Sequence, residues 1–526
     1  MPADPSGART TRRSLILVTT LALALRAWPL HVPYLHPDQE FVPGMALHAL
    51  ASHSWRPDSL VYPSGLFMVL RTAYGAVATL GAGPEHLVHT WTSDPWPFLL
   101  VARVWSCLMG VIAVALTGLL GTHLLGRPWG AVAALLLAVS PVHVRESHWG
   151  ALDVPAGALL LASLAALARS RIVRGRGWSI AAGAFAGAAM AFRWQAGTAL
   201  LALPLVELTD GRRSMHARIG RLAVGGLAAL GTFALLSPYA LLDPAQMWHD
   251  LGVQAFVSFL QAGPPSLPIA TMLALGMGVP ACGLALIGLV AALRARPSAV
   301  AVAALVTIPL LASMLFAERI FIRYTVPLLP FVALGAAAGV AAIQRQLAGG
   351  TAIAIGVGLV AIAIVDPLAR SVATVRLLAR EDTRHLAGRW LVEHAPAGTT
   401  LLVPGPAWYS NPVLPPGRFR LSSYAWDGST FNPAEPGARF LITTQHPGLP
   451  SQGTVPPTIA AWLEHHARPV AQFRALVPGG TPGLFEPPDA NFLPLRGFTD
   501  AVRPGPDIVV WQLPEPPQDG TSGMGR

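Results

Sequence analysis

The 526-residue sequence contains no lysine, so all 36 of its basic side chains are arginines. Charged residues make up only 12% of the chain, about half the fraction of an average soluble domain. With 53% hydrophobic residues and a mean hydropathy of +0.51, this scarcity of charge excludes an ordinary soluble protein. Long apolar segments recur from Ser14 to about Asp366 and predict a polytopic α-helical membrane protein.

Other residues and motifs that are rare or absent exclude further classes of function. The only two cysteines, Cys107 and Cys282, fall inside apolar segments, which argues against a disulfide framework, a cysteine-ligated metal and redox chemistry. The sequence has no Gly-rich phosphate loop, no HExxH and no nucleophile elbow. The formal net charge of +10 comes from arginines in short loops between apolar segments, so we expect no nucleic-acid partner.

The apolar segments predict about eleven transmembrane helices. We place them at residues 14–30, 97–121, 129–142, 154–169, 178–192, 196–208, 222–238, 269–293, 298–316, 325–343 and 351–367. Arginines precede the first segment and follow the fourth, sixth and eighth, which puts one face of the protein in the cytoplasm by the positive-inside rule. The N-terminus is then inside and the C-terminus outside, in a multi-pass protein of the cytoplasmic (inner) membrane.

The acidic residues of the membrane region fall mostly on the other side. Asp38, Glu40, Glu146 and Asp153 all lie in predicted outer loops or at outer helix ends. The first outer loop, residues 31–96, carries apolar residues at helical spacing over 41–51 and 62–81, which predicts helices lying along the membrane interface. Chemistry that depends on these carboxylates would therefore be extracytoplasmic.

The composition changes after Asp366, and polar turns replace the apolar runs. We expect a transmembrane domain at 1–368, a small extracytoplasmic α/β domain at 369–513 and a disordered tail at 514–526. Within the α/β domain, helices are predicted at 380–394 and 458–466. Strands are predicted at 400–403, 418–421, 440–444 and 508–513.

The first candidate site is His36-Pro37-Asp38-Gln39-Glu40, directly after the first apolar segment. Ionisable groups held beside a bilayer are costly and usually functional, so Asp38 and Glu40 are candidate catalytic carboxylates. They could act as a base or hold a divalent cation. The structural alternative is an interfacial acid paired with a nearby arginine such as Arg26 or Arg56.

A second cluster occupies the loop from Pro141 to Asp153. Glu146, His148 and Asp153 carry side chains suited to Mg²⁺, Mn²⁺ or Zn²⁺, although their spacing matches no standard metal site. With Asp38 from the first loop, Glu146 and His148 form a candidate metal-binding set. The alternative for Asp153 is that it caps the helix that begins there.

Three arginines are candidates for binding phosphate. Arg319 and Arg323 are four residues apart, which would place them on one helical face at headgroup depth. Guanidinium groups match phosphate oxygens well. Arg193 occupies a similar outer turn. The alternative is contact with ordinary lipid headgroups.

Four stretches resemble the GT-C superfamily of membrane glycosyltransferases, in particular the protein O-mannosyltransferase and aminoarabinose-transferase group. They are Leu35-His36-Pro37-Asp38-Gln39-Glu40, the segment from Ser140-Pro141 to Asp153-Val154-Pro155, Arg323-Tyr324 with Pro327 and Pro330, and Asp382-Thr383-Arg384 with Ala387 and Trp390. The resemblance implies that Asp38 activates or orients the acceptor. In this chain Gln39 separates the two acids, whereas many relatives have them adjacent.

The resemblance also implies roles for the other candidates. Glu146 and Asp153 would assist Asp38 or hold a metal, and Arg319 or Arg323 would hold the phosphate of the donor. The implied reaction is inverting transfer of a hexose or pentose from a polyprenyl-phosphate sugar to a protein, lipid or glycan acceptor. A divalent cation is a candidate cofactor, since metal use varies across the superfamily.

Two other functions are consistent with an apolar, multi-span chain. A flippase or transporter for lipid-linked sugars would place polar groups near the bilayer midplane, often in repeated halves. Here the charges gather at outer helix ends and no internal repeat is evident. A non-catalytic anchor for the C-terminal domain would not require Asp38, Glu146 and Arg323 to converge.

Overall fold

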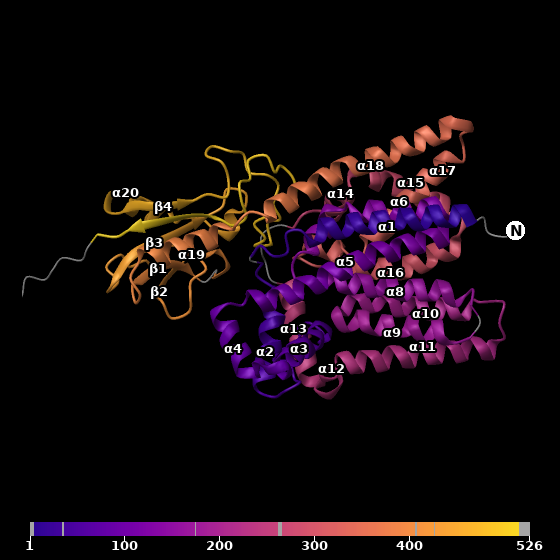
Figure 1. Cartoon of the computed structure of the whole chain (residues 1–526), viewed down its shortest axis with the longest axis horizontal. Helices are drawn as coiled ribbons and strands as arrows, with labels where there is room; N and C mark the ends of the chain where they lie inside the picture. The colour runs from indigo at the N-terminus through magenta and orange to yellow at the C-terminus, as the bar shows by residue number, and fades with distance from the viewer. Residues whose placement is uncertain are drawn as a thin grey trace, which may run out of the picture. The chain divides into compact units, whose positions relative to one another are not determined.

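A computed structural model describes residues 5–33, 36–173, 175–260, 266–405, 408–425 and 427–514. The chain forms two compact units (Figure 1). Unit 1 comprises Met1–His31 and Asp38–Arg376, and unit 2 comprises Val32–Pro37 and Leu377–Arg526. The tail expected at 514–526 lies, except for its first residue, outside the described residues.

Unit 1 consists of helices. Its α-helices are α1 Pro5–Ala27, α2 Phe41–Ala51, α3 Gly65–Val77, α4 Pro84–Ser93, α5 Trp96–Leu125, α6 Arg127–Ala138, α7 Pro141–Glu146, α8 Asp153–Ser170, α9 Gly177–Phe192, α10 Ala199–Leu208, α11 Met215–Leu236, α12 Tyr239–Leu242, α13 Pro244–Phe259, α14 Ile269–Met277, α15 Val279–Ala295, α16 Pro297–Leu315, α17 Leu329–Gln344 and α18 Gly349–Leu378. Three other helical turns are η1 Ala78–Ala82, η2 Trp194–Thr198 and η3 Ile322–Thr325.

The long helices of unit 1 have the length and composition of membrane spans. Among the described residues, five are long and apolar enough to cross a bilayer, and seven if each of two bent pairs counts as one span. Several shorter apolar helices, including α6, α9 and α17, coincide with expected spans. The polytopic helical class is therefore confirmed, while the count of eleven and the orientation stay predictions.

One expected span is broken. The continuous helix expected at 269–293 is two helices, α14 and α15, bent by 105° at Gly278. Gly278 has φ +83°, a left-handed conformation that glycine adopts without a steric penalty. Pro280 follows in the first turn of α15, where its missing N–H costs nothing. The hydrophobic pattern of the sequence does not reveal this bend, because α14 and α15 are both hydrophobic.

The last span was expected to end at Asp366, but α18 continues to Leu378. The Asp366 carboxylate accepts from the Arg370 guanidinium one turn later, at 2.7 Å from Nη2. An acid neutralised at (i, i+4) is compatible with a continuing helix, so the polar residue did not mark its end. The division between the two units falls after Arg376 rather than after residue 368.

The outer loop expected at 31–96 contains α2, α3 and α4. Helix α2 coincides with the expected 41–51 segment, whereas α4 was not anticipated. Figure 1 shows α2, α3, α4 and α13 gathered at one end of the α8–α11 bundle. Hydrogen bonds tie this loop to α13: Arg56 Nη2 donates to Asp243 Oδ2 at 2.6 Å, and the Leu60 N–H donates to Asp250 Oδ2 at 2.5 Å.

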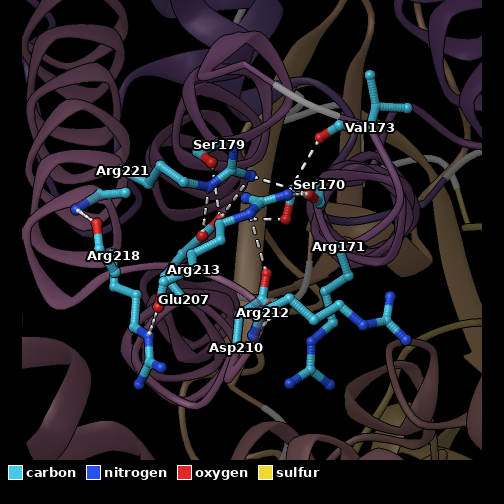
Figure 2. A network of polar contacts seen from close by, with 12 residues as sticks. Ser170, Arg171, Val173, Ser179, Glu207, Asp210, Arg212, Arg213, Arg218 and Arg221 are labelled. Carbon is cyan, nitrogen blue, oxygen red and sulfur yellow. Dashed lines mark hydrogen bonds and ion pairs between the residues drawn. The ribbon is translucent and has the colours of Figure 1, made fainter.

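Buried polar residues join the opposite ends of α8, α9, α10 and α11 (Figure 2). The Glu207 carboxylate, 1% exposed, pairs with Arg221 Nε at 2.8 Å and accepts from the Ser179 and Ser170 hydroxyls at 2.7 and 3.1 Å. Arg213 pairs with Asp210 beside it at 3.2 Å. These contacts fix the four helices relative to one another at that end.

Unit 2 is built around a five-stranded sheet. Its strands are β1 Thr400–Gly405, β2 Arg420–Ala425, β3 Ala438–Gln445, β4 Arg468–Phe473 and β5 Asp507–Gln512, in the order β2-β1-β3-β5-β4. Strand β1 is parallel to both β2 and β3, whereas β5 is antiparallel to β3 and β4. The predicted strands all overlap observed ones, and β4 was missed.

One helix covers each face of this sheet. The core on one face combines Leu391 of α19 (Thr383–His394) with Leu401 and Ile442. The core on the other face combines Leu463 of α20 (Pro457–His466) with Leu441. Because neighbouring strand residues point to opposite faces, Leu401 and Leu402 serve different cores. Two short turns, η4 Trp408–Ser410 and η5 Pro450–Gln452, complete the unit.

The Asp382-Thr383-Arg384 motif is structural. Asp382 is the N-cap of α19 and accepts from the Arg384 N–H, while its carboxylate receives Arg384 Nε at 2.8 Å and Nη2 at 2.6 Å. Both side chains are fully buried. Burial alone would raise the pKa of Asp382, but the Arg384 charge and hydrogen bonds outweigh it and hold that pKa below its usual value.

Candidate active site

Asp38 lies between α1 and α2, in the loop that the sequence singled out. Its Oδ2 atom is 2.9 Å from Nη2 of Arg323, which belongs to the single turn η3 before α17. The Arg323 side chain is 9% exposed, whereas the Asp38 side chain is 48% exposed. The pair therefore combines a nearly buried cation with a carboxylate that a substrate can reach.

A second ion pair joins the first residue of α8 to the residue that follows α9. Asp153 opens α8, and Arg193 follows the last residue of α9, with 2.9 Å between Arg193 Nε and Asp153 Oδ1. Both side chains are nearly buried. Leu152, not Asp153, is the N-cap residue of α8, so the expected capping role of Asp153 is wrong.

Two tyrosine rings, those of Tyr62 and Tyr324, contact the Arg193 guanidinium of the second ion pair. The Arg193 guanidinium lies 5.5 Å from the centre of the Tyr62 ring and 4.9 Å from that of Tyr324. Burial raises the pKa of Tyr62 to about 12, with the negative charge of Asp38 acting in the same sense and Arg193 and Arg323 opposing it. Asp38, Arg323 and Arg193 are thus all close enough to act on one phenol.

Arg319 is placed differently from its prediction. Residues 317–321 are not helical, so Arg319 and Arg323 do not share a helical face. The Arg319 N–H donates to the Ser258 carbonyl oxygen, which ties this segment to α13. Both guanidiniums nonetheless contact the Phe321 ring, at 5.4 Å from its centre for Arg319 and 4.2 Å for Arg323.

Glu146 is buried inside unit 1. Its Oε1 is 2.8 Å from Arg145 Nη2, and its Oε2 accepts from Trp149 Nε1 at 3.0 Å. His148 is also buried, and its Nδ1–H donates to the Val144 carbonyl oxygen at 2.8 Å. Burial lowers the pKa of His148 to about 4, so its ring is neutral at neutral pH.

The expected metal-binding set does not assemble. No three His, Cys, Asp or Glu side chains among the described residues are arranged to hold a metal ion. Asp38 is paired with Arg323, Glu146 with Arg145, and both His148 nitrogens face backbone carbonyl oxygens. Asp38, Glu146 and His148 therefore do not fit a shared cation, and no catalytic step is assigned to one.

Glu40 lies immediately before α2 and makes no ion pair with the residues that the structure describes. Burial raises the pKa of its carboxyl. Arg26 and Arg56, which the sequence suggested as partners for Asp38 or Glu40, contact other groups. Arg26 donates to the carbonyl oxygens of Leu137 and Ala138, and Arg56 pairs with Asp243.

Sequence reasoning did not select Tyr62 and Tyr324. Tyr324 could have been selected, because it follows Arg323 in one of the four stretches that resemble the GT-C superfamily. Tyr62 is one of only seven tyrosines and stands in Tyr62-Pro63 within the first outer loop. Nothing in its neighbours in sequence indicates that its ring contacts Arg193, which lies directly after α9.

An apolar groove of about 800 Å³ runs along α5, α8 and α9. Trp105 and Phe192 line it near the end that carries Arg193, and their rings stack at 6.3 Å. Met109, Leu116 and Phe185 continue it along the helices. The groove can accommodate a long hydrocarbon chain.

Comparisons with known proteins find a matching family and similar solved structures. Residues 99–239, which cover most of α5 and all of α6 to α11, match the dolichyl-phosphate-mannose-protein mannosyltransferase family. The resemblance to the GT-C superfamily is confirmed. A search of curated proteins finds no match.

Solved structures with the same fold include membrane transferases from two organisms. ArnT from Cupriavidus metallidurans bound to undecaprenyl phosphate is 17% identical, with a TM-score of 0.53 over 97% of this chain and 98% of that one. The archaeal oligosaccharyltransferase AglB from Archaeoglobus fulgidus, in complex with an inhibitory peptide and a dolichol-phosphate, is 11% identical with a TM-score of 0.53. That match covers 84% of this chain and 70% of AglB. At these identities the likeness establishes the fold.

Proposed function

We propose that this chain is a membrane glycosyltransferase that moves a hexose or pentose from a polyprenyl-phosphate donor to a protein, lipid or glycan acceptor. The observation that carries the proposal is the convergence of Asp38–Arg323 and Asp153–Arg193 around Tyr62. Residues distant in sequence supply two carboxylates and two guanidiniums to one place. A non-catalytic anchor would have no need of this arrangement.

The reaction is an inverting displacement at the anomeric carbon. The bond from that carbon to the phosphate oxygen breaks with its electron pair going to the phosphate, while the acceptor oxygen forms the new bond. Asp38, which is open to solvent, accepts the proton of the acceptor. Such general-base assistance contributes roughly 10²–10⁴-fold. Arg323 and Arg193 stabilise the departing phosphate in a site of low dielectric.

The second carboxylate acts through an arginine. Asp153 is nearly buried and ion-paired, so it is poorly placed to receive a proton from an entering acceptor. It holds the Arg193 guanidinium in position as the substrate phosphate arrives. The groove beside Phe192 offers a path for the prenyl chain, which a lipid-linked donor requires.

The site faces the extracytoplasmic side of the cytoplasmic membrane in this proposal. Asp153 and Arg193 are at one end of α8 and α9, while Arg169 and the arginines around Glu207 are at the other. Arginine-rich ends are typical of the cytoplasmic face. An inner N-terminus, eleven spans and an extracytoplasmic α/β domain are part of the same proposal.

Surface glycans of a deletion strain test the proposal in the cell. We expect mass spectrometry of envelope proteins, lipids and polysaccharides to show one class that has lost a single sugar residue. The wild-type gene restores that residue. An unchanged glycan inventory in the deletion strain would contradict a role in sugar transfer.

A further inference from the structure

Tyr62 lies next to the ion pairs of the candidate site. Its ring contacts the Arg193 guanidinium at 5.5 Å and meets the Phe41 ring edge-on at 6.2 Å. The charges of Asp38 and Arg323 also affect this phenol: Asp38 raises the pKa of Tyr62 and Arg323 lowers it. The Tyr62 phenol thus lies against one of the two guanidiniums that the proposed reaction uses and within the electrostatic influence of Asp38 and Arg323.

We propose that the Tyr62 hydroxyl donates a hydrogen bond to the phosphate of the polyprenyl-phosphate sugar. This hydrogen bond becomes stronger as the phosphate departs. This inference rests on the proposed function and adds a residue to it. A phosphate held between Arg193 and Arg323 meets Tyr62, because Tyr62 is near both guanidiniums. Tyr62 is therefore a catalytic residue alongside Asp38.

The chemistry of the departing group favours such a donor. The donor is a phosphodiester with one negative charge, and cleavage at the anomeric carbon leaves a monoester that carries the electron pair of the broken bond. A fixed O–H aimed at that oxygen stabilises the transition state more than the ground state. Tyr62 keeps its own proton throughout, since the acceptor proton goes to Asp38.

Burial makes the phenol a dependable donor. The raised pKa of Tyr62 keeps the hydroxyl protonated across the physiological range. A guanidinium supplies charge, but each of the two arginines also holds a carboxylate. The phenol adds a neutral donor without another ion that would need a partner.

The test is Tyr62→Phe in the full-length protein, because phenylalanine keeps the ring against Arg193 and Phe41 and removes only the hydroxyl. We expect kcat to fall about 10²-fold with little change in the affinity for the intact donor. Affinity for polyprenyl phosphate, the product monoester, falls about tenfold. This second measurement does not depend on turnover.

Tyr74→Phe is the matched control. Tyr74 lies in the same outer loop and donates its hydroxyl to the Phe98 carbonyl oxygen at 3.0 Å, away from the ion pairs. Its loss costs a structural hydrogen bond and leaves kcat unchanged. Comparable losses of kcat in both variants would assign Tyr62 a structural role and overturn the inference.

The outcomes separate this inference from the proposed function. If the wild type transfers sugar and Tyr62→Phe matches it in kcat and in polyprenyl phosphate affinity, the inference is wrong and the function stands. If the wild type cleaves no donor, the proposed function is wrong. Polyprenyl phosphate binding then still decides whether Tyr62 contacts phosphate: unchanged binding in Tyr62→Phe would refute the contact.

Discussion

Asp38 and Asp153 both pair with an arginine, yet their exposure differs in a way that separates their roles. The Asp38 side chain is 48% exposed and that of Asp153 only 5%. An acceptor can approach the first carboxylate, whereas the second is confined between α8 and Arg193. This difference in exposure therefore favours proton transfer at Asp38 and orientation of Arg193 at Asp153.

Asp38→Asn should abolish sugar transfer while the protein still folds. The amide keeps the size of the side chain but cannot accept a proton, so a loss of roughly 10²–10⁴-fold is expected. Initial rates of transfer by the purified variant measure this. Asp58→Asn is the control, since Asp58 pairs with His48 at the exposed surface. Full activity of the Asp38 variant would exclude it as the base.

Arg323→Ala should weaken binding of the donor more than binding of the acceptor. A charge-assisted contact to phosphate contributes about 1.5–3 kcal/mol, so donor affinity should fall by roughly ten- to a hundredfold. Titration with polyprenyl-phosphate sugar measures the change. Arg56→Ala, which removes an arginine 55% exposed and paired with Asp243, should leave affinity intact. Equal donor affinity in the wild type and Arg323→Ala would remove the assignment.

At the scale of elements, α8 and α9 are held at both ends. At one end they carry Asp153 and Arg193. At the opposite end Ser170 of α8 and Ser179 of α9 donate to Glu207, which pairs with Arg221 (Figure 2). Between these ends α9 packs directly against α11, because Gly183 has no side chain and a Cβ there would overlap the Gly225 carbonyl oxygen. A rigid pair of helices thus supports the ion pair at the site.

Glu207→Ala should destabilise the protein by about 3–5 kcal/mol, because it leaves the buried Arg221 without its carboxylate. Thermal unfolding in detergent would report a lower Tm. Replacing both residues, as Glu207→Leu with Arg221→Met, should recover much of the loss. Arg212→Ala, at an exposed position between α10 and α11, should leave the Tm unchanged. A Glu207→Ala variant as stable as the wild type would show that the network is dispensable.

The sequence predicted the charged residues of the candidate site but not which of them pair with each other. Asp38 was selected because a charge beside a bilayer is costly. Asp153 was selected for its metal-ligand chemistry, and Arg193 and Arg323 because guanidinium groups match phosphate. All of these are local arguments. The pairing of these residues depends on how η3 and α9 meet the first outer loop, which periodicity does not encode. Tyr62 and the bend at Gly278 were missed for the same reason, since both depend on contacts or conformations specific to the fold.

For the whole molecule, the two units differ in how well sequence pattern described them. Apolar runs located most helices of unit 1, but α18 passed its expected end because Arg370 neutralises Asp366. In unit 2 the alternating strands were located, whereas β4 was not, because Arg468–Phe473 carries a proline and few alternating apolar residues at a sheet edge. Edge strands carry the weakest burial signal.

The stability of unit 2 should depend on pH through His446. Burial against Phe485 and Phe492 lowers the pKa of this histidine to about 4, from 6.5 in an unfolded chain. The unfolded state therefore binds more protons between these values, and stability should fall by about 3 kcal/mol as the pH drops from 7 to 4. Hydrogen exchange of β3 and β5 amides in the full-length protein measures this loss.

His446→Asn is the variant that isolates this effect. Asparagine can accept from the Gly448 N–H as His446 Nδ1 does at 3.2 Å, but it does not titrate. Its stability should therefore vary less between pH 7 and 4. Asp507 acts in the opposite sense, because burial raises its pKa and favours the fold as the pH falls. Identical pH profiles for the variant and wild type would exclude His446 as the source.

Cleavage of the donor by purified protein in proteoliposomes tests the central claim most directly. The reaction contains a polyprenyl-phosphate sugar with a labelled sugar, a cell-envelope acceptor fraction and no other enzyme. The account predicts that labelled sugar passes to the acceptor and free polyprenyl phosphate accumulates in equal amount, in the wild type but not in Asp38→Asn. Movement of intact donor between leaflets without cleavage would identify a flippase and contradict the account.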